Sequence, residues 1–390
     1  MRSIAARTRR RFLAEGAAFA AAAATPLPVL AEASAGEVAP AASDAFVADV
    51  VREVAAEARG NVAVSPISLQ AALALAALGA RGATRERLQS VLGLADLDPA
   101  AVHAQFATPL LQASRAAFVR HAAIEPAYAR AIAAALSADV RKLPDGGAEA
   151  ARTINAWVDA ATAHRIPALF DEVPEGLPLV LADAVHLKFR WRHIFDPAAT
   201  RPRPFHRDAG EPVSVPTMSK TLATATGECR AGTFVRLPFE GVEGGVDLVL
   251  PREGSSAQEA LDIVLRAPQQ LDAGAHRFVD LSVPRFELHA GGSMGHAVAR
   301  AGLAPLFARA DLSGISPSLA GSAIGEIAQK VWLKFDETGV EAAAATGVIV
   351  TAASISRVEP LVLVFDRPFA LLIRDRRTLF AAIVRDPSAS

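Results

Sequence analysis

Hydrophobic and polar positions follow two different spacings along the chain. In the first half, apolar residues mostly recur every three or four positions, as on one face of a helix. In the second half, short runs rich in β-branched and aromatic residues are bounded by glycine and proline, as in strands. The expected helices cover 44–59, 67–78, 84–93, 126–136, 148–164, 256–266 and 292–301. The expected strands cover 179–189, 233–239, 245–250, 278–288, 324–335, 361–365, 369–373 and 379–385. This order predicts an α+β fold, without repeating βαβ units.

One segment near the C-terminus has the pattern of a strand and the composition of a loop. It begins at Gly339, contains no proline up to Ser356, and holds four consecutive alanines. One of its two alternating sets is small or apolar throughout: Val340, Ala342, Ala344, Thr346, Val348, Val350 and Ala352. The other set holds the one charge, Glu341. The segment is therefore predicted to adopt two conformations, an exposed loop and a central strand.

Composition restricts the partners. The chain has 390 residues, of which 52% are hydrophobic, and a formal net charge of −1. It is long enough for a large core, and its charge gives no reason to expect nucleic acid or an anionic membrane as partner. Its single cysteine, Cys229, excludes an intrachain disulfide. No internal repeat or linker divides the chain, so we expect one domain.

The N-terminal 35 residues have the order of an export signal. Thr8-Arg9-Arg10-Arg11-Phe12-Leu13 resembles a twin-arginine motif, and an alanine-rich apolar stretch and small-x-small cleavage sites follow. The apolar stretch is too short for a transmembrane helix. Removing residues 1–35 takes away five arginines and two glutamates and moves the formal charge from −1 to −4. We expect the mature chain, 36–390, to be exported to the periplasm or secreted.

Motifs of enzyme chemistry are scarce in the sequence. One Gly-x-Ser-x-Gly string occurs, Gly291-Gly292-Ser293-Met294-Gly295, but the chain lacks the repeating βαβ order in which that motif carries a nucleophile. There is no Ser-x-x-Lys motif, and the nine histidines form no zinc-binding pair such as His-x-x-x-His. The glycine pairs at 244–245 and 291–292 lack the context of a phosphate-binding loop. We therefore expect no enzymatic activity, no cofactor and no metal.

The segment from Glu337 resembles the hinge of the serpin family of protease inhibitors. The family pattern, roughly Glu-x-Gly-x-x-Ala-x-x-x-Thr, is matched by Glu337, Gly339, Ala342 and Thr346. Further matching motifs occur in family order at 61–68, 78–84, 154–158, 188–191 with Phe195, 237–241, 283–286, 311–315, 366–369 and 379–380. The resemblance extends over some 330 residues.

This resemblance implies a serpin fold, with a large mixed central β-sheet, helices packed around it, smaller sheets and an exposed reactive loop at about 338–357. It also implies inhibition of a serine protease, with a cysteine protease as an alternative target, through a covalent acyl complex formed by a monomer. The implied hinge comprises Glu337, Gly339, Val340, Glu341, Ala342, Ala343, Ala344, Ala345 and Thr346. A non-inhibitory binding or chaperone-type serpin is the alternative.

The resemblance also places a set of polar residues where the main sheet would open. Ser65, Ser68, Asp183 and Gln329 correspond to positions beneath the opening, where many members have asparagine in place of Asp183 and histidine in place of Gln329. A buried carboxylate needs donors, which Ser65 or Ser68 could supply. Ser65, which precedes Pro66, also fits a helix N-cap, and the two roles are compatible.

At the upper end of the sheet, the resemblance pairs Glu337 with Arg285 and places Trp191 beside them. An exposed pair of this kind contributes only about 0–1 kcal/mol, so an ordinary surface ion pair is the alternative.

Two scissile bonds are possible. Counting seventeen positions from Glu337 places the bond between Ala353 and Ser354, which suits elastase-like or subtilisin-like enzymes. A bond between Arg357 and Val358 would suit trypsin-like enzymes but needs a longer hinge-side segment.

Overall fold

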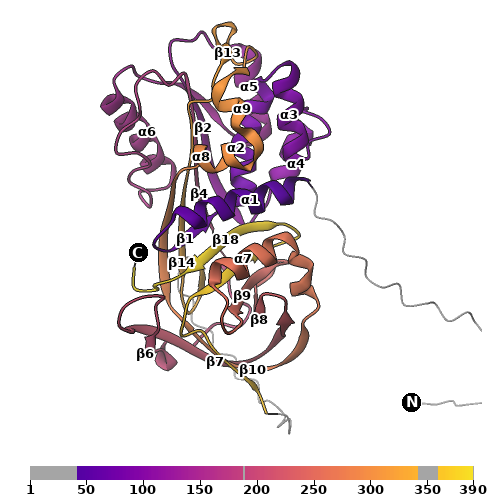
Figure 1. The fold of residues 1–390 in the computed structure, drawn as a ribbon, viewed down its shortest axis with the longest axis vertical. Helices are drawn as coiled ribbons and strands as arrows, with labels where there is room; N and C mark the ends of the chain where they lie inside the picture. The colour runs from indigo at the N-terminus through magenta and orange to yellow at the C-terminus, as the bar shows by residue number, and fades with distance from the viewer. Residues whose placement is uncertain (1–41, 188, 341–358, 390) are drawn as a thin grey trace, which may run out of the picture. The chain divides into compact units, whose positions relative to one another are not determined.

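Two β-sheets organise the protein, and the computed structural model describes residues 42–187, 189–340 and 359–389 (Figure 1). The five-stranded sheet has the order β11-β14-β4-β2-β3. Its strands are Phe286–Ser293 (β11), Glu326–Phe335 (β14), Leu179–Leu187 (β4), Leu111–Val119 (β2) and Asp139–Lys142 (β3). Pro40–Ser390 form one compact unit.

The second sheet has nine strands in the order β1-β18-β17-β9-β8-β7-β10-β16, with β6 paired to β7. Its strands are Val62–Val64 (β1), Thr378–Val384 (β18), Phe369–Arg374 (β17), Gly245–Pro251 (β9), Gly232–Pro238 (β8), Val213–Cys229 (β7), Ala275–Pro284 (β10), Leu361–Val364 (β16) and Arg201–Phe205 (β6). Two short ladders complete the set, Ala310–Asp311 (β12) with Ala320–Ser322 (β13), and Gly339–Val340 (β15) with Phe189–Arg190 (β5).

Helices cover both faces of the five-stranded sheet. The helices are Ala42–Glu57 (α1), Pro66–Gly79 (α2), Gly82–Leu92 (α3), Pro99–Phe106 (α4), Pro126–Leu136 (α5), Gly147–Ala161 (α6), Ala257–Arg266 (α7), Gly295–Val298 (α8) and Ala304–Ala308 (α9). Helix α2 lies on one side of β4 and α6 on the other (Figure 1). Because both faces are covered, all nine residues of β4 are buried, which explains why the strand is mostly apolar.

The predicted α+β architecture, a multistranded sheet with flanking helices and further sheets, is confirmed, but some elements differ. The expected strand 278–288 is two strands in different sheets, since the chain leaves β10 at Pro284 and enters β11 at Phe286. Strand β7, of 17 residues, was not predicted, because its threonine-rich sequence carries little hydrophobic signal. The expected helix from 292 begins at Gly295, after β11 ends. Thr84 does not cap α3; its hydroxyl accepts a hydrogen bond from the Asp311 amide at 2.9 Å.

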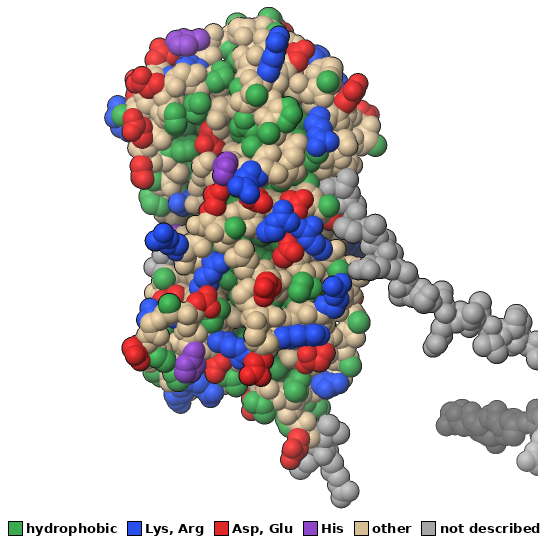
Figure 2. Space-filling view, in the orientation of Figure 1, with side chains coloured by type: hydrophobic (Ala, Val, Ile, Leu, Met, Phe, Trp, Pro, Cys, Tyr) green, Lys and Arg blue, Asp and Glu red, His purple; other side chains and the backbone are tan. Residues whose placement is uncertain are grey.

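Charged side chains of both signs are intermixed over the face shown in Figure 2. Such mixing agrees with the nearly balanced charge of the chain. Within the described ranges, no helix is long and apolar enough to cross a lipid bilayer.

Candidate functional site

The five-stranded sheet has a parallel seam at its centre, which we define as the border between β4 and β14. These two strands run in the same direction, and Gln329 lies directly opposite Asp183. The outer neighbours, β11 beside β14 and β2 beside β4, both run antiparallel to them. A strand that entered the seam from the hairpin after β14 would therefore be antiparallel to both β14 and β4.

A polar network lies beneath the seam, around Asp183, which is fully buried. The Ser68 hydroxyl donates to Asp183 Oδ1 at 2.7 Å, and the Gln329 Nε2 donates to Oδ2 at 2.9 Å. The Arg115 Nε lies 3.2 Å from Asp183 Oδ1, and its Nη2 donates to the Ser68 hydroxyl at 3.0 Å. The carboxylate therefore has three partners, which come from α2, β14 and β2.

Ser65 belongs to the same network but makes no contact with the carboxylate. Its amide donates to Gln329 Oε1 at 2.8 Å, and its carbonyl accepts from Gln329 Nε2 at 3.0 Å. Its hydroxyl donates to the Leu379 carbonyl at 2.7 Å. Ser65 stands at the N-cap position of α2, but its side chain makes no capping hydrogen bond. Of the two candidate donors to Asp183, Ser68 is the one that donates.

Arg115 is a member of this site that the sequence analysis did not name. Its side chain is 9% exposed, and burial lowers its pKa from the ordinary value, an effect that the charge of Asp183 opposes. The available signal was a pair of opposite charges, Arg115 and Asp183, each inside a mostly apolar segment. Only the antiparallel register places them directly opposite one another.

A tight turn connects β14 to β15 at the upper end of the seam. Asp336 Oδ1 accepts from the Thr338 amide at 2.9 Å, the Thr338 hydroxyl at 2.8 Å and the Gly339 amide at 3.2 Å. The Asp336 amide in turn donates to the Gly339 carbonyl at 3.1 Å. Asp336, which was not predicted as a site residue, thus holds the reversal of the chain.

Gly339 is required in this turn on two grounds. Its φ of +151° is a conformation that side chains disfavour. A Cβ there would lie 2.2 Å from the Phe189 carbonyl oxygen. The close approach lets Gly339 and Val340 pair antiparallel with Arg190 and Phe189, which continue the line of β4.

Glu337 is 7% exposed and has two side-chain partners. The Thr200 hydroxyl donates to its Oε1 at 2.7 Å, whereas the Arg285 Nη1 lies 3.7 Å from the same atom. The Arg285 side chain is 49% exposed. The neutral hydrogen bond from Thr200, not anticipated from sequence, is the closer contact.

Trp191 anchors the turn from the side. Its Nε1 donates to the Asp336 carbonyl at 2.8 Å, and its amide donates to the Thr338 carbonyl at 3.1 Å. The indole is buried and packs on Phe335, with ring centroids 5.0 Å apart. Trp191 thus lies beside the hinge and hydrogen-bonds its backbone, without contacting the Glu337 carboxylate.

Several predicted residues lie outside the described part of the chain. They are Glu341, Ala342, Ala343, Ala344, Ala345 and Thr346 of the hinge, and Ala353, Ser354, Arg357 and Val358 of the two possible scissile bonds. Within the described ranges, no cluster of three or more His, Cys, Asp or Glu side chains could hold a metal ion.

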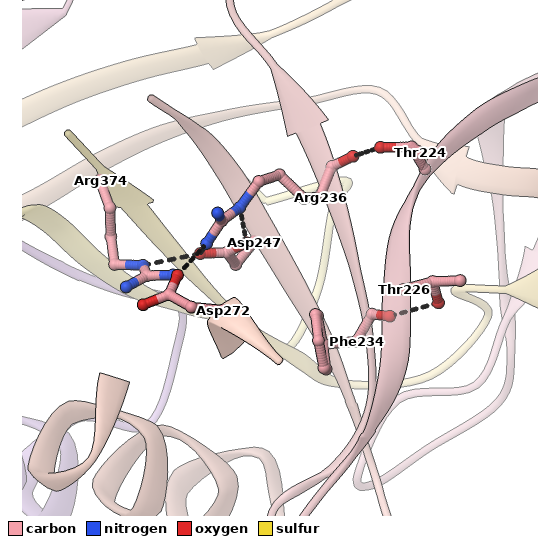
Figure 3. A network of polar contacts seen from close by, with 7 residues as sticks. All are labelled: Thr224, Thr226, Phe234, Arg236, Asp247, Asp272 and Arg374. Atoms are coloured by element: carbon pink, nitrogen blue, oxygen red, sulfur yellow. Dashed lines mark hydrogen bonds and ion pairs between the residues drawn. The ribbon is translucent and has the colours of Figure 1, made fainter. Parts of the chain in front are cut away.

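A second buried carboxylate, Asp247, lies in the nine-stranded sheet. Figure 3 shows Asp247 on β9 between Arg236 of β8 and Arg374 of β17, with Asp272 completing the cluster. Arg236 donates to Asp247 at 2.7 and 3.0 Å, and Arg374 donates to it at 2.7 Å. Both arginines also donate to Asp272, at 3.0 and 2.9 Å.

Strand insertion requires a seam between two strands and a hinge at the upper end of the seam. Comparison with known proteins agrees with this arrangement. The family described as "Serpin (serine protease inhibitor)" matches residues 41–387. The chain belongs to the serpin family. Iripin-8 of Ixodes ricinus is 31% identical to this serpin over 85% of its chain and 88% of the relative.

Two further relatives show the range of the family. Corticosteroid-binding globulin of Ovis aries is also 31% identical, over 88% of this serpin and 84% of the relative. The crystal structure of Serpin48 from the insect Tenebrio molitor superimposes with a TM-score of 0.78 at 26% identity. That alignment covers 88% of this serpin and 97% of Serpin48.

Proposed function

We propose that this serpin inhibits serine proteases by cleavage of its reactive loop and insertion of the cut hinge into the seam. The observation that carries this proposal is the β15–β5 pairing at the head of the seam. Gly339 and Val340 already run antiparallel to the continuation of β4. Insertion then means extending an existing ladder downward between β4 and β14.

The register of this ladder fits the sequence pattern of the loop. Val340 pairs with Phe189, so six residues further on, Thr346 would come opposite Asp183. Directly opposite residues share one face of a sheet, so the small and apolar set that includes Ala342 and Ala344 would face α2. Glu341 would point to the other face.

The energy released would be large enough to disorder a protease. Inserting 14 residues, Val340 to Ala353, adds roughly one hydrogen bond per residue. At about 0.5–1.5 kcal/mol net for each bond, the gain is on the order of ten kcal/mol. A whole protease domain is stable by about 5–15 kcal/mol. The uncut inhibitor must then be held in its active form kinetically.

In the proposed chemistry, the hydroxyl oxygen of the protease serine attacks the carbonyl carbon of Ala353. The Ala353–Ser354 peptide bond breaks, the proton passes to the new amino terminus of Ser354, and an ester joins the two proteins. A small alanine suits elastase-like or subtilisin-like enzymes, and cleavage at Arg357–Val358 by trypsin-like enzymes is the alternative. A cysteine protease would form the corresponding thioester. The mature monomer, 36–390, would act after export, in the periplasm or outside the cell.

A non-inhibitory binding role is the second candidate, because one relative is named for corticosteroid binding. The described residues line several cavities, of about 180, 330, 500 and 620 Å³. Ligand sites usually measure about 300–1,000 Å³. Cavity volume therefore does not exclude a binding role, and inhibition is favoured because Gly339 and Val340 already pair beside the seam.

The test mixes the mature protein with an elastase-like and a trypsin-like protease. We expect a complex that survives denaturing electrophoresis and a released peptide that begins at Ser354; one beginning at Val358 would assign the scissile bond to Arg357. Val340→Arg and Ala342→Pro should abolish the complex and leave a substrate, because both block the inserted ladder. Glu341→Gln, on the outward-facing set, is the matched control and should inhibit normally. Cleavage by the proteases without any complex would indicate a non-inhibitory serpin.

A further inference from the structure

The network beneath the seam is divided along the seam itself. On the β4 side, Asp183 is bound by Ser68 and Arg115. On the β14 side, Gln329 is bound through both atoms of its amide to the backbone of Ser65. One side-chain contact joins the two halves, the 2.9 Å bond from Gln329 Nε2 to Asp183 Oδ2.

Separation of β4 from β14 would break that joining contact. Adjacent strands lie about 4.8 Å apart, so an added strand would double the distance between Asp183 and Gln329. Arg115 would stay with Asp183, since the two are direct cross-strand partners on β2 and β4, a strand pair that insertion does not divide.

We propose that Arg115 is a positioning residue for strand insertion: as the ionic partner of Asp183, it keeps that buried carboxylate paired when the seam opens. The inference rests on the proposed inhibitory function. An ionised carboxylate that lost its donors in a buried site would be strongly destabilised. Between Val340 and Ser356 there is no lysine or arginine that could replace Arg115.

The consequence for inhibition is kinetic. After cleavage, insertion competes with hydrolysis of the acyl-enzyme, and the slower the seam opens, the more serpin is released as cut substrate. In the wild type, opening leaves Asp183 with two of three partners; in Arg115→Gln it leaves Ser68 as the one strong donor. The barrier to insertion is therefore higher in Arg115→Gln than in the wild type, in addition to any loss of stability of the closed sheet.

The experiment compares wild type, Arg115→Gln, Arg115→Lys and the double variant Arg115→Gln/Asp183→Asn with the same target protease. For each, the ratio of cleaved serpin to covalent complex and the Tm before and after loop cleavage are measured. Arg115→Gln should raise the ratio about tenfold, which corresponds to about 1.4 kcal/mol on the barrier, because the buried carboxylate loses its ionic partner. Arg115→Lys, which keeps the charge, and the double variant, which removes the need for it, should stay within about threefold of wild type.

Arg141→Gln is the matched control, an arginine on the neighbouring strand β3 that pairs with Asp139 at the surface. It should behave as wild type. The role of Arg115 is overturned if Arg115→Gln lowers both Tm values without changing the ratio, or if the double variant is as impaired as the single one. A wild type that forms no complex and gains no Tm on cleavage would instead overturn the proposed function, and the role of Arg115 with it.

Discussion

Two buried carboxylates in this serpin, Asp183 and Asp247, are bound in opposite ways. Both are fully buried in strands, and both have arginine on the adjacent strand. Asp247 has two arginines, on β8 and β17, which lie on either side of its own strand β9. Asp183 has one arginine and two neutral donors, one of them across the seam. The first arrangement joins three strands, whereas in the second the bond from Gln329 to Asp183 is the one side-chain hydrogen bond described in this network that crosses the seam.

The pKa values of Arg236 and Arg115 shift in opposite directions, in agreement with this difference. Burial acts to lower the pKa of Arg236, but hydrogen bonds and charge from Asp247 and Asp272 outweigh it and raise the pKa. For Arg115, burial lowers the pKa and the charge of Asp183 does not restore it. In the Asp247 cluster, where the sheet stays closed, the carboxylates therefore more than offset the effect of burial on arginine. At Asp183, where the sheet is expected to open, the carboxylate does not offset it.

The largest expected effect comes from removing an arginine of the Asp247 cluster. Arg374→Met should destabilise the protein by about 2–3 kcal/mol, because a buried carboxylate loses a charged donor. The apparent Tm should fall by about 3–4 °C, and equally before and after loop cleavage, because β9 and β17 remain paired in both forms.

Arg376→Met is the matched control for this change, since the Arg376 side chain is 85% exposed and pairs with Glu243 at the surface. Its Tm should match that of wild type. A loss in Arg374→Met confined to the uncut form would contradict the contrast between the two carboxylates.

A smaller effect is expected at Glu337, where the half-buried Thr200 and the exposed Arg285 share one carboxylate oxygen. Thr200→Val removes the 2.7 Å hydrogen bond and should cost about 1 kcal/mol. Arg285→Ala removes the 3.7 Å ion pair with Glu337, in which the Arg285 side chain is half-exposed, and should cost less than about 0.5 kcal/mol. Thermal unfolding of the two uncut variants measures both. If Arg285→Ala proved the more damaging, the ion pair, and not the Thr200 bond, would hold the hinge.

The smallest effect is a pH dependence at Asp272. Burial acts to raise its pKa, but the bonds from Arg374 and Arg236 dominate and hold the pKa below its ordinary value of 3.8. Its ionised form therefore stabilises the fold above about pH 4, and this contribution is lost as pH falls through the lowered pKa. Asp272→Asn should flatten the decrease in Tm with acid below pH 4 and cost under about 1 kcal/mol at pH 7, since Asp272 is half-exposed. An acid profile identical to wild type would contradict a role for Asp272 in the cluster.

Much of the fold was predictable because local patterns agreed with the final environment. The mostly apolar run 179–189 was expected as a strand and the run 67–78 as a helix, and both are found there, as β4 and α2. Strand β7 escaped prediction because its alternating threonines and alanines indicate neither strand nor helix strongly. Asp336 escaped because a carboxylate that accepts from the amides two and three residues further on looks like any other loop aspartate until the turn is seen.

The sequence by itself determined the order of elements, the strand-like alternation after Gly339 and the family, because these depend on residue spacing along the chain. The tertiary structure decided which side chains meet. Arg115 with Asp183, Thr200 with Glu337, Arg236 with Asp247, and Asp247 with Arg374 are 11 to 137 residues apart in sequence. Strand register brings the pairs on strands together, and the turn after β14 brings Glu337 to Thr200. Register depends on the packing of whole faces against the core, a property that no single segment contains.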